Sequence, residues 1–324
     1  MSVPYEDPNY NPYPPSVLIG TAVLFMITSI LSVGLRFYAR FLGQTPLGID
    51  DWITIPSMVT CRFIGNANHC SYLTATTAGG LGSHQELVGG ELSHTTKLYI
   101  YEKTRYAYEV IGSFGLCITK LSVLFFFRRL FQVRPFYIVN NILIGVTIAW
   151  GIAYTVSTAS QCTPISTIWD RLETEYRYFC LDIFSFYLLS YAASDLMLDL
   201  IIFTLPLPML WQLRMPWRKK LAVAGIFLLG SIAIASSITR VVVYNWAIFF
   251  ARAEPQLWSI NTTWYSTGLL FWHLAENAVG LLSCCLPSYA PLFQKYATKS
   301  QYRTCGRRKP ADSLWRCVGP ASGS

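Results

Sequence analysis

The chain has 324 residues, of which 53% are hydrophobic and only 13% are charged, about half the charged share of an ordinary soluble domain. This composition excludes a typical soluble enzyme and predicts a membrane protein. The formal net charge of +8 could indicate nucleic-acid binding, but basic residues of membrane proteins collect on the cytoplasmic side, where anionic lipids attract them. We therefore expect a lipid bilayer as the partner, and no nucleic acid.

Seven apolar stretches follow a short N-terminal tail, and each has the length that a helix needs to cross a hydrocarbon core of about 30 Å. The clearest, Val17 to Leu35, contains no charged residue. In chain order the stretches are residues 17–35, 52–78, 106–127, 136–160, 181–210, 221–251 and 263–286. The pattern predicts an all-α polytopic membrane protein with a seven-transmembrane-helix bundle over residues 17–293, a tail at residues 1–16 and a basic tail at residues 294–324.

The second stretch is the weakest because it contains Arg62, Asn66, Asn68 and His69, and a central Arg alone costs about 3 kcal/mol on insertion. Without it, six spans would remain, and their better orientation divides the basic residues of the connections fourteen to nine. Seven spans divide them sixteen to six, which favours seven. The other alternative is an error in the gene model between Cys61 and Ala78.

Lys and Arg lie mainly in alternate connections, and positive residues stay on the cytoplasmic side of a membrane. The sixteen-to-six division therefore predicts that the N-terminus is outside and the C-terminus is cytoplasmic. Asn261 begins the only N-glycosylation sequon, and it would lie outside. Cys162 and Cys180 bracket the outside connection between the fourth and fifth spans, where an oxidising compartment favours a disulfide over free thiols. No Cys/His group has zinc spacing, so no metal site is predicted.

Two further features concern helix packing. Gly145, Ala149, Ala153 and Ser157 repeat every four residues in the fourth span, a small-residue stripe that predicts close approach by another helix. Pro206 and the proline two residues later are expected to kink or end the fifth span.

Short motifs occur in a characteristic order along these spans. They are Leu35 to Arg40 (LRFYAR), Gly48 to Trp52 (GIDDW), Gly80 to His84 (GLGSH), Lys120 to Phe131 (KLSVLFFFRRLF), Cys162 to Pro164, Trp169 and Asp170, Cys180, Asp195, Leu205 to Pro208 (LPLP), Gly225 to Gly230 (GIFLLG), Ser236, Arg240, Glu276 and Cys285 to Pro287. In this order they resemble the fungal rhodopsin-domain family of seven-helix integral membrane proteins, which includes receptor-like and toxin-cluster members. The resemblance covers about residues 17–293 and departs from the family pattern at Cys61 to Ala78. It implies a multi-pass protein of a fungal plasma membrane or endomembrane.

A retinal chromophore is not expected, because it needs a buried lysine on the last span. Thr262 to Gln294 contains no lysine, and Lys120, on the third span, is the only lysine within any predicted span. We therefore expect no cofactor.

Several ionisable residues lie inside the predicted spans, where they normally face the bundle interior and a partner. Lys120, Asp195 and Glu276 have similar depths, and Arg240 lies in the outer half of its span, where Glu109 could meet it. Helical spacing places Asp199 on the same face as Asp195, and His273 on the same face as Glu276. The predicted interior polar site is Glu109, Lys120, Asp195, Asp199, Arg240, His273 and Glu276.

This set is compatible with a structural polar network, with a ligand pocket, or with an acid site. The topology and the resemblance favour a receptor-like protein with an unknown small lipophilic ligand and a cytoplasmic signalling partner, associated with a secondary-metabolite gene cluster. The alternative is a membrane-embedded, cyclase-type enzyme in which Glu276 or Asp195 protonates a lipophilic terpenoid or polyketide. A transporter is the third hypothesis, although no inverted repeat is visible. The sequence does not decide whether the protein is an enzyme, and it favours a protein without enzymatic activity.

The charge distribution generates a topology prediction. A glycosylation reporter fused after Ser324 should stay unmodified, whereas the same reporter placed before Tyr5 should be glycosylated in the secretory pathway. A glycosylated C-terminal reporter would contradict the orientation.

Overall fold

The computed structural model describes residues 13–42, 72–84, 87–88, 91–92, 95–130, 133–170, 184–208, 217–285 and 289. Six long helices dominate these residues: α1 (Pro15–Leu42), α4 (Thr96–Leu130), α5 (Arg134–Ala159), α8 (Phe184–Thr204), α10 (Trp217–Ala253) and α13 (Thr267–Cys285). Six segments of the described chain are long and apolar enough to cross a membrane; five fall within one of these helices, and the sixth, Thr262–Cys285, begins shortly before α13 and includes it. The prediction of a helical membrane bundle is confirmed.

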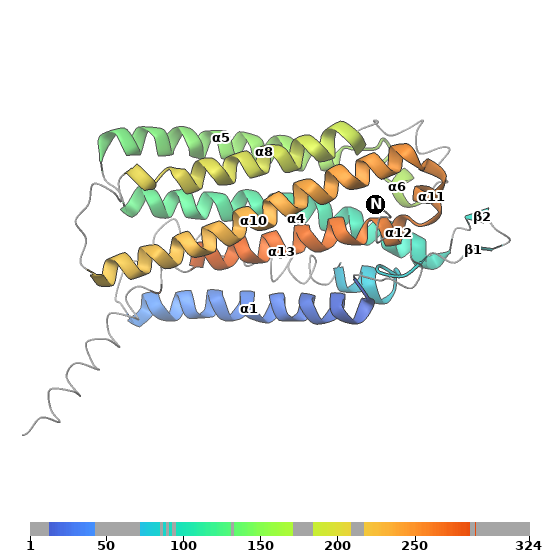
Figure 1. Cartoon of the computed structure of the whole chain (residues 1–324), viewed down its shortest axis with the longest axis horizontal. Helices are drawn as coiled ribbons and strands as arrows, with labels where there is room; N and C mark the ends of the chain where they lie inside the picture. Colours follow the sequence, from blue (N-terminus) through green and yellow to red (C-terminus); the bar gives the residue numbers. More distant parts are fainter. Residues whose placement is uncertain are drawn as a thin grey trace, which may run out of the picture.

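Short elements gather at one end of the bundle, at the right of Figure 1. They are the antiparallel pair β1 (Leu87–Val88) and β2 (Glu91–Leu92) and the short helices α6 (Thr167–Asp170), α11 (Pro255–Ile260) and α12 (Thr262–Tyr265). The C-terminal ends of α1 and α4 and the N-terminal end of α5 lie at the opposite end (Figure 1). From α4 to α13 the long helices thus alternate in direction, as a chain that crosses a bilayer repeatedly requires, whereas α1 and α4 run the same way (Figure 1). Which end faces the cytoplasm stays a prediction.

Most of the predicted second span lies outside the described residues, so the count of seven helices stays a prediction. Its last part, residues 72–77, is helical. Tyr72 and Ala75 are buried there in a core cluster that also contains Leu18 of α1 and Tyr101 of α4. The end of this segment therefore packs between the first and third predicted spans.

The helices pack in a continuous arrangement: α5 on α4, α4 on α13, α13 on α10, and α10 on α8, with α1 against α13 at the edge of the bundle (Figure 1). Outward faces are apolar, as Leu31 of α1 and Ile152 of α5 illustrate. Apolar side chains on the outside suit lipid, which cannot hydrogen-bond to polar ones.

Two sequence features at helix ends have clear structural consequences. Helix α8 ends at Thr204, two residues before Pro206, as predicted. Arg36, near the end of α1, is 1% exposed, although it lies just beyond the predicted first span, residues 17–35. Its Nη1 donates to the carbonyl of Cys284 at 2.6 Å. A cation there satisfies a carbonyl in the last turn of α13 and opposes the negative end of the helix dipole.

Among the described residues, the small-residue stripe of α5 does not form the close helix contact that its spacing predicts. Gly145, Ala149 and Ala153 are exposed, and no described atom lies within 4 Å of a Cβ built at Gly145. The close approach lies on another face of the helix, where a Cβ at Gly151 would overlap Sγ of Cys117 on α4. Glycine at 151 therefore permits the α4–α5 contact.

Replacing Gly151 by Ala should destabilise the bundle by about 1–3 kcal/mol, the usual cost of overpacking a core. Gly145→Ala is the matched control, because its added methyl group meets open space on the same helix. That control should be neutral or slightly stabilising, since Ala favours a helix over Gly by at most about 1 kcal/mol. The measurement is the unfolding midpoint of each purified variant in detergent. Equal midpoints for the two variants would contradict the assignment of the close contact.

Candidate functional site

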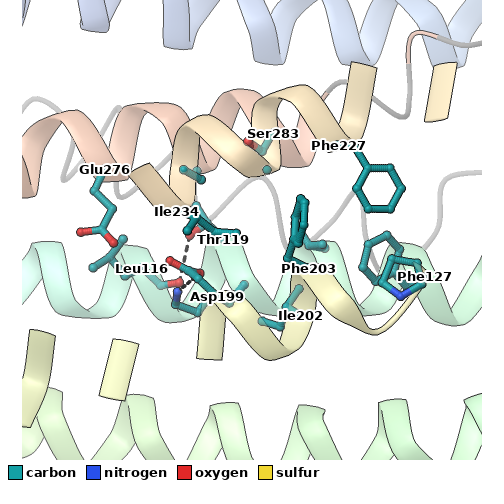
Figure 2. A pocket seen from close by; sticks show the side chains of 16 residues that line it. Leu116, Thr119, Phe127, Asp199, Ile202, Phe203, Phe227, Ile234, Glu276 and Ser283 are labelled. Carbon is teal, nitrogen blue, oxygen red and sulfur yellow. Dashed lines mark hydrogen bonds and ion pairs between the residues drawn. The ribbon is translucent and has the colours of Figure 1, made fainter. Parts of the chain in front are cut away.

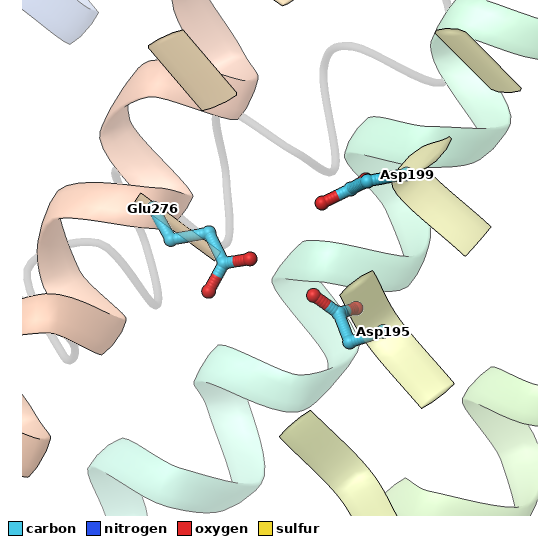
Figure 3. A group of neighbouring side chains, drawn as sticks. All are labelled: Asp195, Asp199 and Glu276. Carbon is cyan, nitrogen blue, oxygen red and sulfur yellow. The ribbon is translucent and has the colours of Figure 1, made fainter. Parts of the chain in front are cut away.

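Five charged side chains from four helices meet in the middle of the bundle. We call this set the central cluster: Lys120 of α4, Asp195 and Asp199 of α8, Arg240 of α10 and Glu276 of α13. Oxygen atoms of the three carboxylates lie within 4.8 Å of one another, and Figure 3 shows the three side chains converging from their helices. The two aspartates share one face because they lie four residues apart on α8.

Asp195 lies between the two cations of the cluster. One carboxylate oxygen, Oδ1, lies 3.3 Å from Nζ of Lys120, and the other, Oδ2, accepts a hydrogen bond of 2.8 Å from Nη2 of Arg240. Both Asp195 and Arg240 are 0% exposed. An isolated ion so far from water would be strongly disfavoured, and this arrangement offsets the desolvation of three charges at once.

Arg240 connects the aspartate side of the cluster to α13. Its Nη1 lies 2.9 Å from Oε2 of Glu276. The guanidinium carbon also lies 5.0 Å from the ring centre of Tyr191 and 5.8 Å from that of Tyr244. Aromatic faces attract a cation, so the two rings help to hold the guanidinium in place.

Asp199 and Glu276 are joined by a hydroxyl group. Ser237 Oγ lies 2.8 Å from Oδ2 of Asp199 and also hydrogen-bonds to Oε1 of Glu276. Lys120 Nζ forms an ion pair with Asp199. The cluster thus contains three acidic groups and two basic groups, linked by one serine.

By distance alone, the three carboxylates are close enough to share a metal ion. Lys120 and Arg240 already supply two positive charges to the same oxygens. A divalent cation would be repelled by both, so the donor set fits internal ion pairing better than metal binding.

A cavity of about 100 Å³ begins at the cluster. We call it the inner pocket. Its polar end includes Lys120, Asp199 and Glu276, and its far end has the rings of Phe127, Phe203 and Phe227. Figure 2 shows the Glu276 and Asp199 carboxylates at one end of the group and the phenylalanines at the other. The remaining lining residues are Leu116, Thr119, Val123, Ile202, Pro206, Gly230, Ala233, Ile234, Gly280 and Ser283.

Two residues of the predicted polar site lie apart from the cluster's ion pairs. Glu109 pairs with Arg105 on its own helix at 2.8 Å, one turn away, whereas Arg240 pairs with Asp195 and Glu276. His273 is buried one turn from Glu276. The ring of Tyr108 lies 5.4 Å from the His273 ring, and no partner for His273 Nε2 is found among the described residues.

Ser237 and the rings of Tyr191 and Tyr244 were not predicted from the sequence as part of the site. For Ser237 a signal was present, because it lies three residues before Arg240 and so shares its helical face. The aromatic end of the inner pocket had no such signal. Phe127, Phe203 and Phe227 come from three different helices, and any of them could equally have faced lipid.

The predicted modification sites stay predictions. Cys162 is buried, and Cys180 lies outside the described residues. Asn261 lies between α11 and α12, where its backbone N–H donates to the carbonyl of Leu257 at 3.2 Å. Cys162 and Asn261 are at the end of the bundle that the charge distribution places outside.

Removing the central arginine, Arg240, should lower the unfolding free energy far more than removing a peripheral arginine. Arg240→Met would leave Asp195 and Glu276 without their shared cation, at a cost of about 3–5 kcal/mol in unfolding free energy. Arg105→Met is the control, since Arg105 and its partners Glu102 and Glu109 are partly exposed and such pairs contribute at most about 1 kcal/mol. Thermal unfolding in detergent measures both losses. A smaller loss for Arg240→Met than for Arg105→Met would show that the cluster does not stabilise the bundle.

Comparison with known proteins places the chain in a family. The sequence model for the fungal rhodopsin domain matches residues 35–295. The chain is 27% identical to the polyenoic acids biosynthesis gene cluster protein Ba17b of Metarhizium anisopliae, over 89% of this chain and 76% of that protein. It is 26% identical to a SAT4 family membrane protein of Emericella nidulans, over 68% of this chain and 52% of that protein.

A further relative is the receptor GIN3 of Arthrobotrys oligospora, which is 23% identical over 87% of this chain and 64% of that protein. No solved structure matches the chain. The domain match spans most of the sequence and includes all five residues of the central cluster. The chain is a membrane protein that belongs to the fungal rhodopsin domain family.

Proposed function

We propose that this chain is a receptor-like membrane protein that binds a small lipophilic ligand in the inner pocket. The main support is the two-ended character of that pocket, which has carboxylates and Lys120 at one end and three phenylalanine rings at the other. A site of this kind orients a ligand, because the apolar part is attracted to the rings and the polar part to the cluster.

The size of the pocket limits how much of a ligand it can enclose. Pockets that enclose a drug-sized ligand usually measure roughly 300–1,000 Å³, and this one measures about 100 Å³. A single ring or a short stretch of chain would fill it. We therefore propose that the pocket takes one end of a longer lipophilic molecule.

The direction of the pocket favours a ligand that arrives from the cytoplasmic side. From the cluster, the lining residues continue to Phe127 near the end of α4, Pro206 just after α8, and Ser283 near the end of α13. These ends belong to the side that the basic residues predict to be cytoplasmic. A ligand made inside the cell, or dissolved in the inner leaflet, would reach the pocket without crossing the cluster, in a plasma membrane or an endomembrane alike.

A membrane-embedded enzyme is the second candidate, and one observation favours it. Asp199 and Glu276 both line the pocket, so either could transfer a proton to a bound molecule. Asp195, the other acid considered from the sequence, does not line it. The relatives support both candidates: one is named as a biosynthesis cluster protein and another as a receptor.

Filling the pocket should abolish function without loss of the protein. Ala233→Phe places a ring in the pocket, whereas Ile232→Phe places the same ring on the exposed face of α10. Introduced into a deletion strain, Ala233→Phe should reproduce the deletion phenotype, and Ile232→Phe should restore the wild type. Fluorescent tagging should find both variants at equal abundance in the same membrane. Full complementation by Ala233→Phe would contradict the proposal that the pocket binds the ligand.

The same strains separate the two candidate functions. A receptor variant loses a transcriptional response while every metabolite can still be formed from supplied precursors. An enzyme variant accumulates the precursor of one missing product. Metabolite profiles and transcript levels, measured together, distinguish these outcomes.

A further inference from the structure

The hydrogen bonds of Ser237 require a proton that the ionised cluster does not supply. Its Oγ lies within hydrogen-bonding distance of three oxygens: Oδ2 of Asp199, Oε1 of Glu276 and the backbone carbonyl of Ala233. A hydroxyl group has one hydrogen and can donate it to only one of these acceptors at full strength. If both carboxyl groups were ionised, at least one carboxylate would face the serine oxygen with no hydrogen between them.

The charge balance of the cluster also indicates that one carboxyl group carries a proton. Lys120 and Arg240 provide two positive charges, and Asp195, Asp199 and Glu276 provide three negative charges when all are ionised. All five side chains lie inside the bundle, where water cannot compensate the surplus. One proton on a carboxyl group makes the cluster neutral.

The neighbouring titratable groups do not remove this surplus. Tyr191 of α8 and Tyr244 of α10 face Arg240 and are neutral as phenols. His273 of α13 could add a positive charge, but an imidazolium must donate from both ring nitrogens. Its Nε2 is buried and has no acceptor within the described part of the chain, and its ring packs edge-on against Tyr108 and Tyr191.

The position of each acid decides where the proton lies. Asp195 contacts both cations and does not line the inner pocket. Asp199 and Glu276 both contact Ser237 and both line the pocket. We propose that Asp199 and Glu276 share one exchangeable proton through Ser237 and present it to the inner pocket.

This proton specifies a class of ligand, a step that rests on the proposed ligand-binding function. A neutral cluster with an acidic hydrogen at the pocket suits an uncharged lipophilic molecule with an acceptor oxygen. A cationic amine would instead displace the proton. Ser237 is a positioning residue here, since it holds the two carboxyl groups at the distance that sharing requires.

Infrared spectroscopy tests the proton itself without any ligand, so its result is independent of the proposed function. Full-length protein in lipid nanodiscs should show the C=O stretch of one protonated, deuterium-sensitive carboxyl group at neutral pH. Raising the pH should remove that band, since the cluster then loses its proton. Asp199→Asn or Glu276→Gln should also remove it, because two acids then balance two cations. Ser237→Ala should keep the proton but shift the band.

Glu102→Gln is the control, since Glu102 pairs with Arg105 outside the cluster, and it should leave the band unchanged. If the amide variants do not fold, wild-type protein labelled with carbon-13 at the carboxyl groups of Asp, and separately of Glu, shows which residue type carries the proton, because the protonated C=O band then moves only when that type is labelled. A wild-type protein with every carboxyl ionised at neutral pH would overturn the proposal. So would a band that persists in both Asp199→Asn and Glu276→Gln.

Discussion

The structure depends on a buried carboxylate that is held between two cations. Asp195 contacts Lys120 on one side and Arg240 on the other, with no exposure of its side chain. In a bundle surrounded by lipid, these three charges have no alternative partner in water, so α4, α8 and α10 must bring them together. Arg240 extends the constraint to α13 through Glu276. Four helices are therefore fixed in depth and rotation by one set of ion pairs.

The inner pocket follows from this arrangement. The ion pairs fix the polar end of the cavity. Small lining residues such as Gly280 and Ala233 leave the space between that end and the phenylalanine rings open. Large apolar side chains would close that space at no cost in polar contacts, so the cavity is not needed for the ion pairs. A structural network accounts for Asp195 and Arg240. Asp199 and Glu276 belong to the same network, and they also line the apolar inner pocket.

The chain belongs to the fungal rhodopsin domain family, and the position of its lysines bears on whether it could hold a retinal chromophore. The family name refers to rhodopsins, but this chain has no lysine on its last span. Its buried lysine lies on α4 and is engaged by two aspartates.

Most of the cluster could be predicted from the sequence, because a charge inside an apolar span has to face the interior and a partner. Depth along the spans was enough to group Lys120 with Asp195 and Glu276. Depth failed for Glu109, which has an arginine one turn away on its own helix, and a local pair forms without any tertiary requirement. Spacing also failed for the small-residue stripe of α5, since the rotation of that helix turns Gly151, and not Gly145, toward α4.

The sequence by itself determined the helical membrane bundle and the charged residues that must be buried with partners, because hydropathy and charge act locally along the chain. Only the tertiary structure decided which acid pairs with which base, that Ser237 joins two carboxyl groups, and that three phenylalanines from separate helices close one pocket. Those features depend on the rotation of each helix about its axis. Rotation is set by the fit of all the neighbouring side chains together, and no single segment contains that information.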